Sequence, residues 1–165
     1  MNLKEITSQV ANLSRHTGEF VRKAAAEFNR DSIEYKGLND MVSYVDKETE
    51  MRLVEGLRKI LPEAGFITEE GMVQQTDSQE FAWIIDPVDG TTNYMHGLPV
   101  FAISIALQQN DKIISGVVYE INRDECFTAW LNGGAYLNEK PIEVSSAKYL
   151  KDSLIATGFH IMTLN

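Results

Sequence analysis

Two aspartates flanking a proline, followed at once by a glycine and two threonines, form the stretch of this sequence best suited to chemistry. The stretch runs from Trp83 to Tyr94 as WIIDPVDGTTNY, and its first three residues read as a short buried strand. Pro87 has no N–H to donate, so we expect regular strand pairing to stop there and to leave Asp86 and Asp89 as a close carboxylate pair. Two such charges repel each other unless a cation or a proton lies between them. Mg²⁺ is a suitable cation because it prefers oxygen ligands such as carboxylates.

The residues that follow the pair suit an anion. Gly90 permits a sharp turn and Thr91 can cap the next helix, so the N–H groups of both would fit a phosphate oxygen. A plain surface turn is the alternative, because Asp-Pro and Asp-Gly pairs are common in turns. A calcium loop does not fit, since with Gly90 as its sixth residue the bidentate-glutamate position falls on His96.

The eight residues 86–93, DPVDGTTN, resemble the signature of the inositol monophosphatase family, the Mg²⁺-dependent and lithium-sensitive phosphatases. The resemblance implies two or three Mg²⁺ ions in a complete enzyme. The metal ligands that it implies are Glu69, Asp86, the backbone carbonyl of Val88, and Asp89. The catalytic residues that it implies are Glu69, Glu70, Thr91, which activates the attacking water, and Asp46, which accepts a hydrogen bond from Thr91. The substrate contacts that it implies are Glu69, Asp89, Gly90 and Thr91.

Asp46 also has an ordinary explanation. The apolar pattern predicts a helix that opens at Val45, and a carboxylate near its start would complement the helix dipole as a simple N-cap. From spacing alone this explanation is favoured. Only the resemblance gives Asp46 a catalytic role.

The adjacent pair Glu69-Glu70 is equally ambiguous by itself. Residues 65–71 read as a short strand that ends in the two glutamates, and a solvated loop explains them well. Because adjacent side chains on a strand point to opposite faces, only one of the two can meet Asp86 and Asp89. The pair resembles the family's Gly-Glu-Glu motif with Thr68 in place of the glycine, which makes Glu69 the ligand and Glu70 its outer partner.

Three other reactive side chains are assigned no chemistry. His16 reads as a solvated helix residue, and His96 as an exposed residue at a helix end. Cys126 lies in a strand-like stretch and reads as a small core residue.

Apolar spacing predicts two long helices followed by a sheet, in a single N-terminal α+β portion that spans residues 1–165. The helices cover 3–29 and 45–61, the second ending at Pro62, with a short strand at 32–36 and a polar turn at 36–40 between them. An antiparallel meander then covers 81–159, because its strands are joined by short turns. Its later strands are expected at 101–107, 113–120, 125–130, 135–138, 142–144 and 153–159.

The resemblance continues through most of the chain. It implies the layered αβαβα sandwich of the sugar phosphatases, an α+β fold with a largely antiparallel sheet. Family members continue further and supply a Trp-Asp motif whose aspartate completes a second metal site, whereas no aspartate follows Asp152 here. We therefore expect the C-terminal α/β half to be missing and the isolated chain to be inactive or weak. The alternative is a non-catalytic fragment or binding module.

Composition narrows the partners. A net charge of −9 over 165 residues argues against a nucleic acid polymer, and no apolar run approaches the roughly 20 residues of a membrane span. The single cysteine excludes an internal disulfide and fits a reducing cytoplasm. By resemblance the partner is a small phosphate ester, with inositol 1-phosphate first, and fructose 1,6-bisphosphate or 3′-phosphoadenosine 5′-phosphate as alternatives. The family also implies a homodimer.

Overall fold

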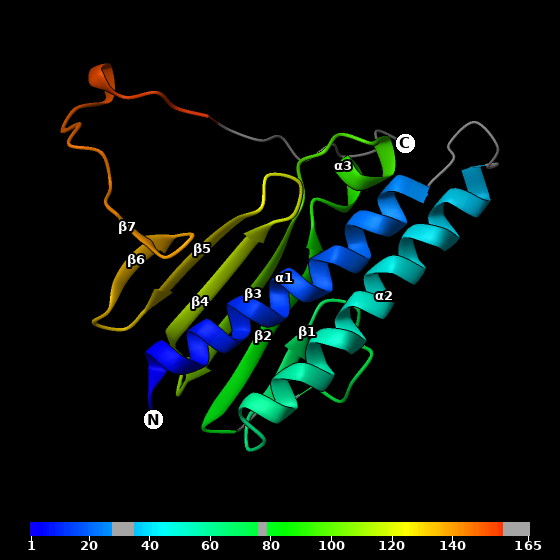
Figure 1. Ribbon diagram of the computed structural model, residues 1–165, viewed down its shortest axis with the longest axis horizontal. Coiled ribbons are helices and arrows are strands. Elements are labelled where there is room, and N and C mark those ends of the chain that lie inside the picture. Colours follow the sequence, from blue (N-terminus) through cyan, green and yellow to red (C-terminus); the bar gives the residue numbers. More distant parts are fainter. Residues whose placement is uncertain (28–34, 76–78, 157–165) are drawn as a thin grey trace.

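The computed structural model describes residues 1–27, 35–75 and 79–156, with the side chains of residues 35–43 left out. Two long helices precede a sheet of seven strands, with one short helix inserted after the second strand (Figure 1). The helices are α1 (Leu3–Glu27), α2 (Tyr35–Ile60), α3 (Thr91–His96) and the 3₁₀ turn η2 (Leu150–Asp152). The strands are β1 (Gly65–Thr68), β2 (Phe81–Asp89), β3 (Ala102–Gln109), β4 (Lys112–Glu120), β5 (Glu125–Trp130), β6 (Gly134–Leu137) and β7 (Lys140–Ile142).

The strands lie in the sheet in the order in which they occur in the chain. β1 and β2 run parallel, and every later neighbour pair is antiparallel. Short turns join the antiparallel strands from β3 onward, whereas residues 90–101, with α3, connect β2 to β3, and residues 69–80 connect the parallel pair. The predicted α+β class with a largely antiparallel sheet is confirmed.

The two long helices cover one face of this sheet (Figure 1). Alternate residues of β3 and β4 point toward them and are buried, as the two-residue period of a strand requires. On the opposite face Val118 is 40% exposed and Phe127 37% exposed. The described residues therefore supply one helical layer and one sheet layer, with the core between them. Its largest fully buried side chains are Trp83, Tyr119, Leu53, Leu57, Ile103, Leu107 and Ile121.

The second helix begins earlier than predicted. α2 starts at Tyr35 rather than at Val45, so the backbone of the expected turn at 36–40 is helical. No proline interrupts the chain before Pro62, and Gly37 alone costs a helix only about 1 kcal/mol. Of the strand expected at 32–36, residues 32–34 lie outside the described residues, and the rest open α2.

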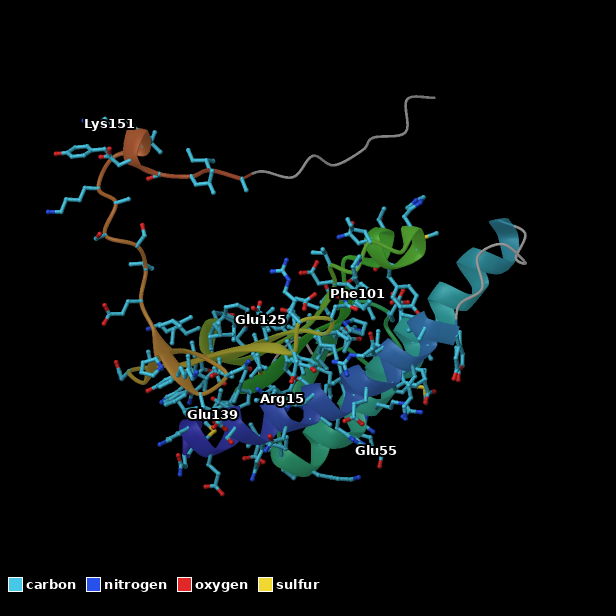
Figure 2. All side chains as sticks on the ribbon, turned by 45° about the horizontal axis from the view of Figure 1, so that its top comes forward. Arg15, Glu55, Phe101, Glu125, Glu139 and Lys151 are labelled. Carbon is cyan, nitrogen blue, oxygen red and sulfur yellow. The ribbon has the colours of Figure 1, made fainter. Side chains whose placement is uncertain are left out.

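The last predicted strand is also different. Residues 153–156 of the stretch 153–159 carry no strand assignment, and residues 157–159 lie outside the described part. Beyond β7 the chain leaves the sheet and passes through η2, where Figure 2 marks Lys151 well away from the main body. Leu150 and Leu154 on this segment are exposed.

Within the described ranges no helix combines the length and apolarity that crossing a membrane requires.

Candidate active site

A break in strand pairing separates the two aspartates at the end of β2. Asp86 pairs with Ser104 and Asp89 with Ala102, but the register shifts between them. The shift follows from Pro87, which cannot donate to the ladder, although the strand resumes and ends at Asp89 instead of stopping at the proline as predicted. Asp86 is half-buried, whereas Asp89 is exposed. The break in pairing therefore places the Asp86 carboxylate partly inside the protein and the Asp89 carboxylate at its surface.

Gly90 makes the turn from β2 into α3. Its φ of 100° lies in the left-handed region, and a Cβ added there would stand 2.9 Å from the carbonyl oxygen of Val100. A side chain is therefore excluded both by backbone conformation and by space. Below this turn Tyr94 packs edge-on against Phe101, with ring centroids 5.2 Å apart, and Figure 2 places Phe101 beside α3.

Thr91 opens α3, and its hydroxyl donates to the carbonyl oxygen of Val88 over 3.1 Å. The acceptor is the same carbonyl that the family resemblance assigns to a metal. The hydrogen bond from Thr91 to Asp46 that the resemblance implies stays a prediction.

Asp46 lies inside α2 rather than at its start, so the explanation as an N-cap does not apply. The side chain is only 5% exposed. Burial, followed by the negative charges of Glu70, Glu69 and Asp86, raises its pKa to about 7. A buried carboxylate thus faces the carboxylates that follow β1 and end β2.

Asp86 has a similar environment. Burial raises its pKa to about 7, together with the charges of Glu69 and Asp89 and a hydrogen bond with Glu69, while the N–H of Val88 donates to it and acts in the opposite direction. Asp86 therefore lies near both Asp89, its partner in the pair expected from spacing, and Glu69, which only the family resemblance assigns to the site. Their mutual repulsion favours a shared proton or a cation.

Glu69 and Glu70 follow β1 rather than ending it, because the strand stops at Thr68. Glu69 is exposed beside Asp86, and Glu70 is half-buried nearer to α2. Burial, and next the charge of Glu50, raises the pKa of Glu70, and Lys47 lowers it. The two glutamates therefore lie in different surroundings, and their roles as ligand and outer partner stay a prediction.

Glu50 was not predicted from the sequence as part of the site. This glutamate is fully buried on α2 and accepts the backbone N–H groups of Glu70 and Met72, each over 2.8 Å. Its spacing of one helical turn from Asp46 was a usable signal, because residues four apart share a helix face.

The donor set fits a hard divalent cation. Every side chain in the cluster offers carboxylate oxygen, and two of the carboxyl groups have pKa values raised to about 7 by crowding and burial. Over the described residues, no three His, Cys, Asp or Glu side chains already converge as ligands of one ion. Asp86 and Glu69 are nevertheless already in hydrogen-bond contact.

The other reactive side chains lie outside this cluster. His96 is exposed at the end of α3, and Cys126 is 1% exposed in β5, as predicted for both. A separate cavity of about 310 Å³ lies between α1 and the β5–β6 hairpin, with Lys4, Arg15 and Trp130 in its lining. It contains none of the predicted site residues, so its size does not make it the candidate active site.

Comparison with known proteins gives a consistent family. The model of the "Inositol monophosphatase family" matches residues 2–163. The chain is 47% identical over 133 residues to "Nus factor SuhB" of Haemophilus influenzae, covering 79% of this chain and 49% of that protein. It is 39% identical over 141 residues to "Inositol-1-monophosphatase" of Rhizobium meliloti, covering 86% of this chain and 53% of that protein.

A solved structure agrees with these relatives. The native structure of the extragenic suppressor protein suhB from Bartonella henselae superimposes with a TM-score of 0.75 at 33% identity, covering 88% of this chain and 56% of that one. The chain spans about half the length of the curated relatives it matches. Because the family model covers nearly all of the sequence, this chain belongs to the inositol monophosphatase family.

Proposed function

We propose that this chain carries the catalytic carboxylates of a Mg²⁺-dependent phosphatase that hydrolyses a small phosphate monoester. The observation that supports this most is the cluster of five carboxylates that comes from α2, the segment after β1 and the end of β2: Asp46, Glu69, Glu70, Asp86 and Asp89. Repulsion among these carboxylates destabilises the folded protein unless a cation is bound. In a phosphatase family, such a cation would take part in catalysis.

The residues proposed to hold Mg²⁺ are Glu69, Asp86, the carbonyl of Val88, and Asp89. When bound, the ion supplies positive charge that acidifies water and neutralises phosphate oxygens. The half-buried Asp86 and the exposed Asp89 lie on either side of the proline break. Together they would hold the ion at the protein's edge, where a substrate can reach it.

The proposed acid–base pair is Thr91 and Asp46. Thr91 Oγ1 would accept a proton from the attacking water while its own hydroxyl hydrogen passes to a carboxylate oxygen of Asp46. The pKa of about 7 for Asp46 suits this role, because the group can hold a proton near neutral pH. In this arrangement the hydroxyl of Thr91 turns from Val88 toward α2.

The substrate end of the site is proposed to use Gly90 and Thr91. Their backbone N–H groups would bind phosphate oxygens, since a turn without a side chain lets an anion approach the backbone closely. Glu69 and Asp89 at the rim would contact the ester, and Glu70 would support the ligands from behind. We propose inositol 1-phosphate as the substrate, because the relative from Rhizobium meliloti is named "Inositol-1-monophosphatase". The name of the relative from Haemophilus influenzae, "Nus factor SuhB", gives no substrate.

The test is phosphate release from inositol 1-phosphate, fructose 1,6-bisphosphate and 3′-phosphoadenosine 5′-phosphate, each with Mg²⁺ and with EDTA. We expect Mg²⁺-dependent release, fastest from inositol 1-phosphate. Thr91→Ala should lower the rate about a hundredfold through the loss of proton transfer. The matched control is Thr92→Ala, because Thr92 is exposed on the same turn of α3.

Equal rates for the Thr91 and Thr92 variants would contradict the role of Thr91. No Mg²⁺-dependent release from any of the three esters would instead favour a binding module without catalysis. Light scattering on the same samples would test a further proposal, that the protein is a homodimer. The single buried cysteine supports our proposal of a reducing, cytoplasmic location.

A further inference from the structure

Glu50 is a buried carboxylate with no part in the proposed chemistry. Its side chain has no exposed surface. Oε2 accepts the N–H of Glu70 and Oε1 accepts the N–H of Met72, each over 2.8 Å. Both oxygens are thus used by the backbone of the segment that follows β1. A carboxylate suits this arrangement because, unlike an amide or a protonated acid, it accepts at both ends.

Gly71, between the two donors, allows them to converge. Its φ of 65° lies in the left-handed region, where a glycine pays no steric cost. A left-handed residue between two N–H groups turns both toward one side and forms a small anion-binding concavity. Here the anion is Glu50 of the chain itself.

The same helix carries Asp46 one turn before Glu50. Residues four apart lie on one helix face, so α2 presents one carboxylate to the catalytic cluster and uses the next to hold the segment that bears Glu69 and Glu70. The separation between Asp46 and these two glutamates therefore depends on the hydrogen bonds of Glu50. Besides these hydrogen bonds, Lys47 of α2 attracts Glu70, but it holds no backbone N–H of the segment in place.

We propose that Glu50 is a positioning residue that fixes Glu69 and Glu70 in the arrangement a divalent cation requires. The inference rests on the proposed function, since it assumes that the cluster binds a cation. Groups that hold metal ligands in place from behind contribute about ten- to a hundredfold in affinity or activity. A purely structural glutamate would affect stability but would leave the affinity of the folded protein for metal unchanged.

The test compares Glu50→Gln with Glu55→Gln in the metal-free protein. Glutamine keeps the size of the side chain but presents an NH₂ group to one of the two N–H donors, so one hydrogen bond is lost. We expect amide hydrogen exchange at Glu70 and Met72 to accelerate at least about tenfold, while amides of β3 and β4 are unchanged. Glu55 is the matched control because it is exposed on the same helix, as Figure 2 shows.

The second measurement is calorimetric titration with Mn²⁺ alone. Glu50→Gln should raise the dissociation constant about tenfold, and Glu55→Gln should leave it unchanged. Equal affinities for wild type and Glu50→Gln would overturn the inference and leave the proposed function standing. A wild-type protein that binds no Mn²⁺ would overturn both.

A second variant keeps the test decisive if Glu50→Gln does not fold. Gly71 is exposed, and a Cβ added there meets no atom within 4 Å, so Gly71→Ala strains only the local backbone. Because the strain opposes the left-handed turn, this variant should weaken Mn²⁺ binding about fivefold and accelerate exchange at the same two amides. Unchanged affinity and unchanged exchange in this variant would overturn the positioning role.

Discussion

Replacing Asp86 by asparagine should lower Mg²⁺-dependent phosphate release more than about a hundredfold while the fold is retained. Replacing a residue that only supports a metal ligand lowers activity by up to about a hundredfold. Asp86 is proposed to be a metal ligand itself, so the loss should be larger. The fold should be retained because asparagine has the same size as aspartate. The substitution also removes a carboxyl group whose negative charge is unfavourable here, since burial, Glu69 and Asp89 raise its pKa to about 7.

The matched control for this substitution is Asp111→Asn. Asp111 is exposed in the β3–β4 turn with a φ of 65°, a conformation that asparagine adopts as readily. The Asp111→Asn variant should release phosphate at the same rate as the wild type. Retention of more than about a tenth of the rate by Asp86→Asn, equivalent to about 1.4 kcal/mol of barrier, would contradict the ligand assignment.

The stability of the metal-free protein should decrease as the pH rises from about 4 to above 7. Asp46 and Asp86 both have pKa values of about 7 in the folded state, against an ordinary aspartate value of 3.8. A raised pKa means that the folded state binds more protons than the unfolded state. The stabilisation is therefore complete below pH 4 and is lost as the pH passes through 7.

Chemical denaturation in EDTA at several pH values measures this effect. Asp86→Asn should flatten the decrease relative to the wild type, because one of the two groups no longer titrates. Adding Mg²⁺ above pH 7 should restore stability by mass action, by about 2.7 kcal/mol at a hundred times its dissociation constant. Identical pH profiles for wild type and variant, or no effect of Mg²⁺, would contradict the electrostatic account of the cluster.

The stretch around Asp86 could be interpreted from the sequence because its determinants are local. Proline removes a donor, glycine allows a left-handed turn, and the two aspartates lie on either side of the break, all within a few residues. The strands from β3 to β6 were predictable for the same reason, since short turns join these adjacent antiparallel strands. Local chemistry of this kind needs no knowledge of distant contacts.

The start of α2 and the role of Glu50 depend on distant contacts. Nothing near Val45 shows that the helix already extends back to Tyr35, because the residues between them neither forbid a helix nor strongly favour one. Glu50 acquires its role from N–H groups twenty residues later in the chain. The predicted strand at 153–159 fails over 153–156, because an apolar run becomes a strand only where another strand pairs with it.

The most direct test of the account is anomalous diffraction from crystals of this protein grown with Mn²⁺. We predict a difference peak at the end of β2, with Glu69, Asp86, the carbonyl of Val88, and Asp89 as its oxygen ligands. Density that is absent there, or that lies only elsewhere on the surface, would show that these carboxylates do not form a cation site.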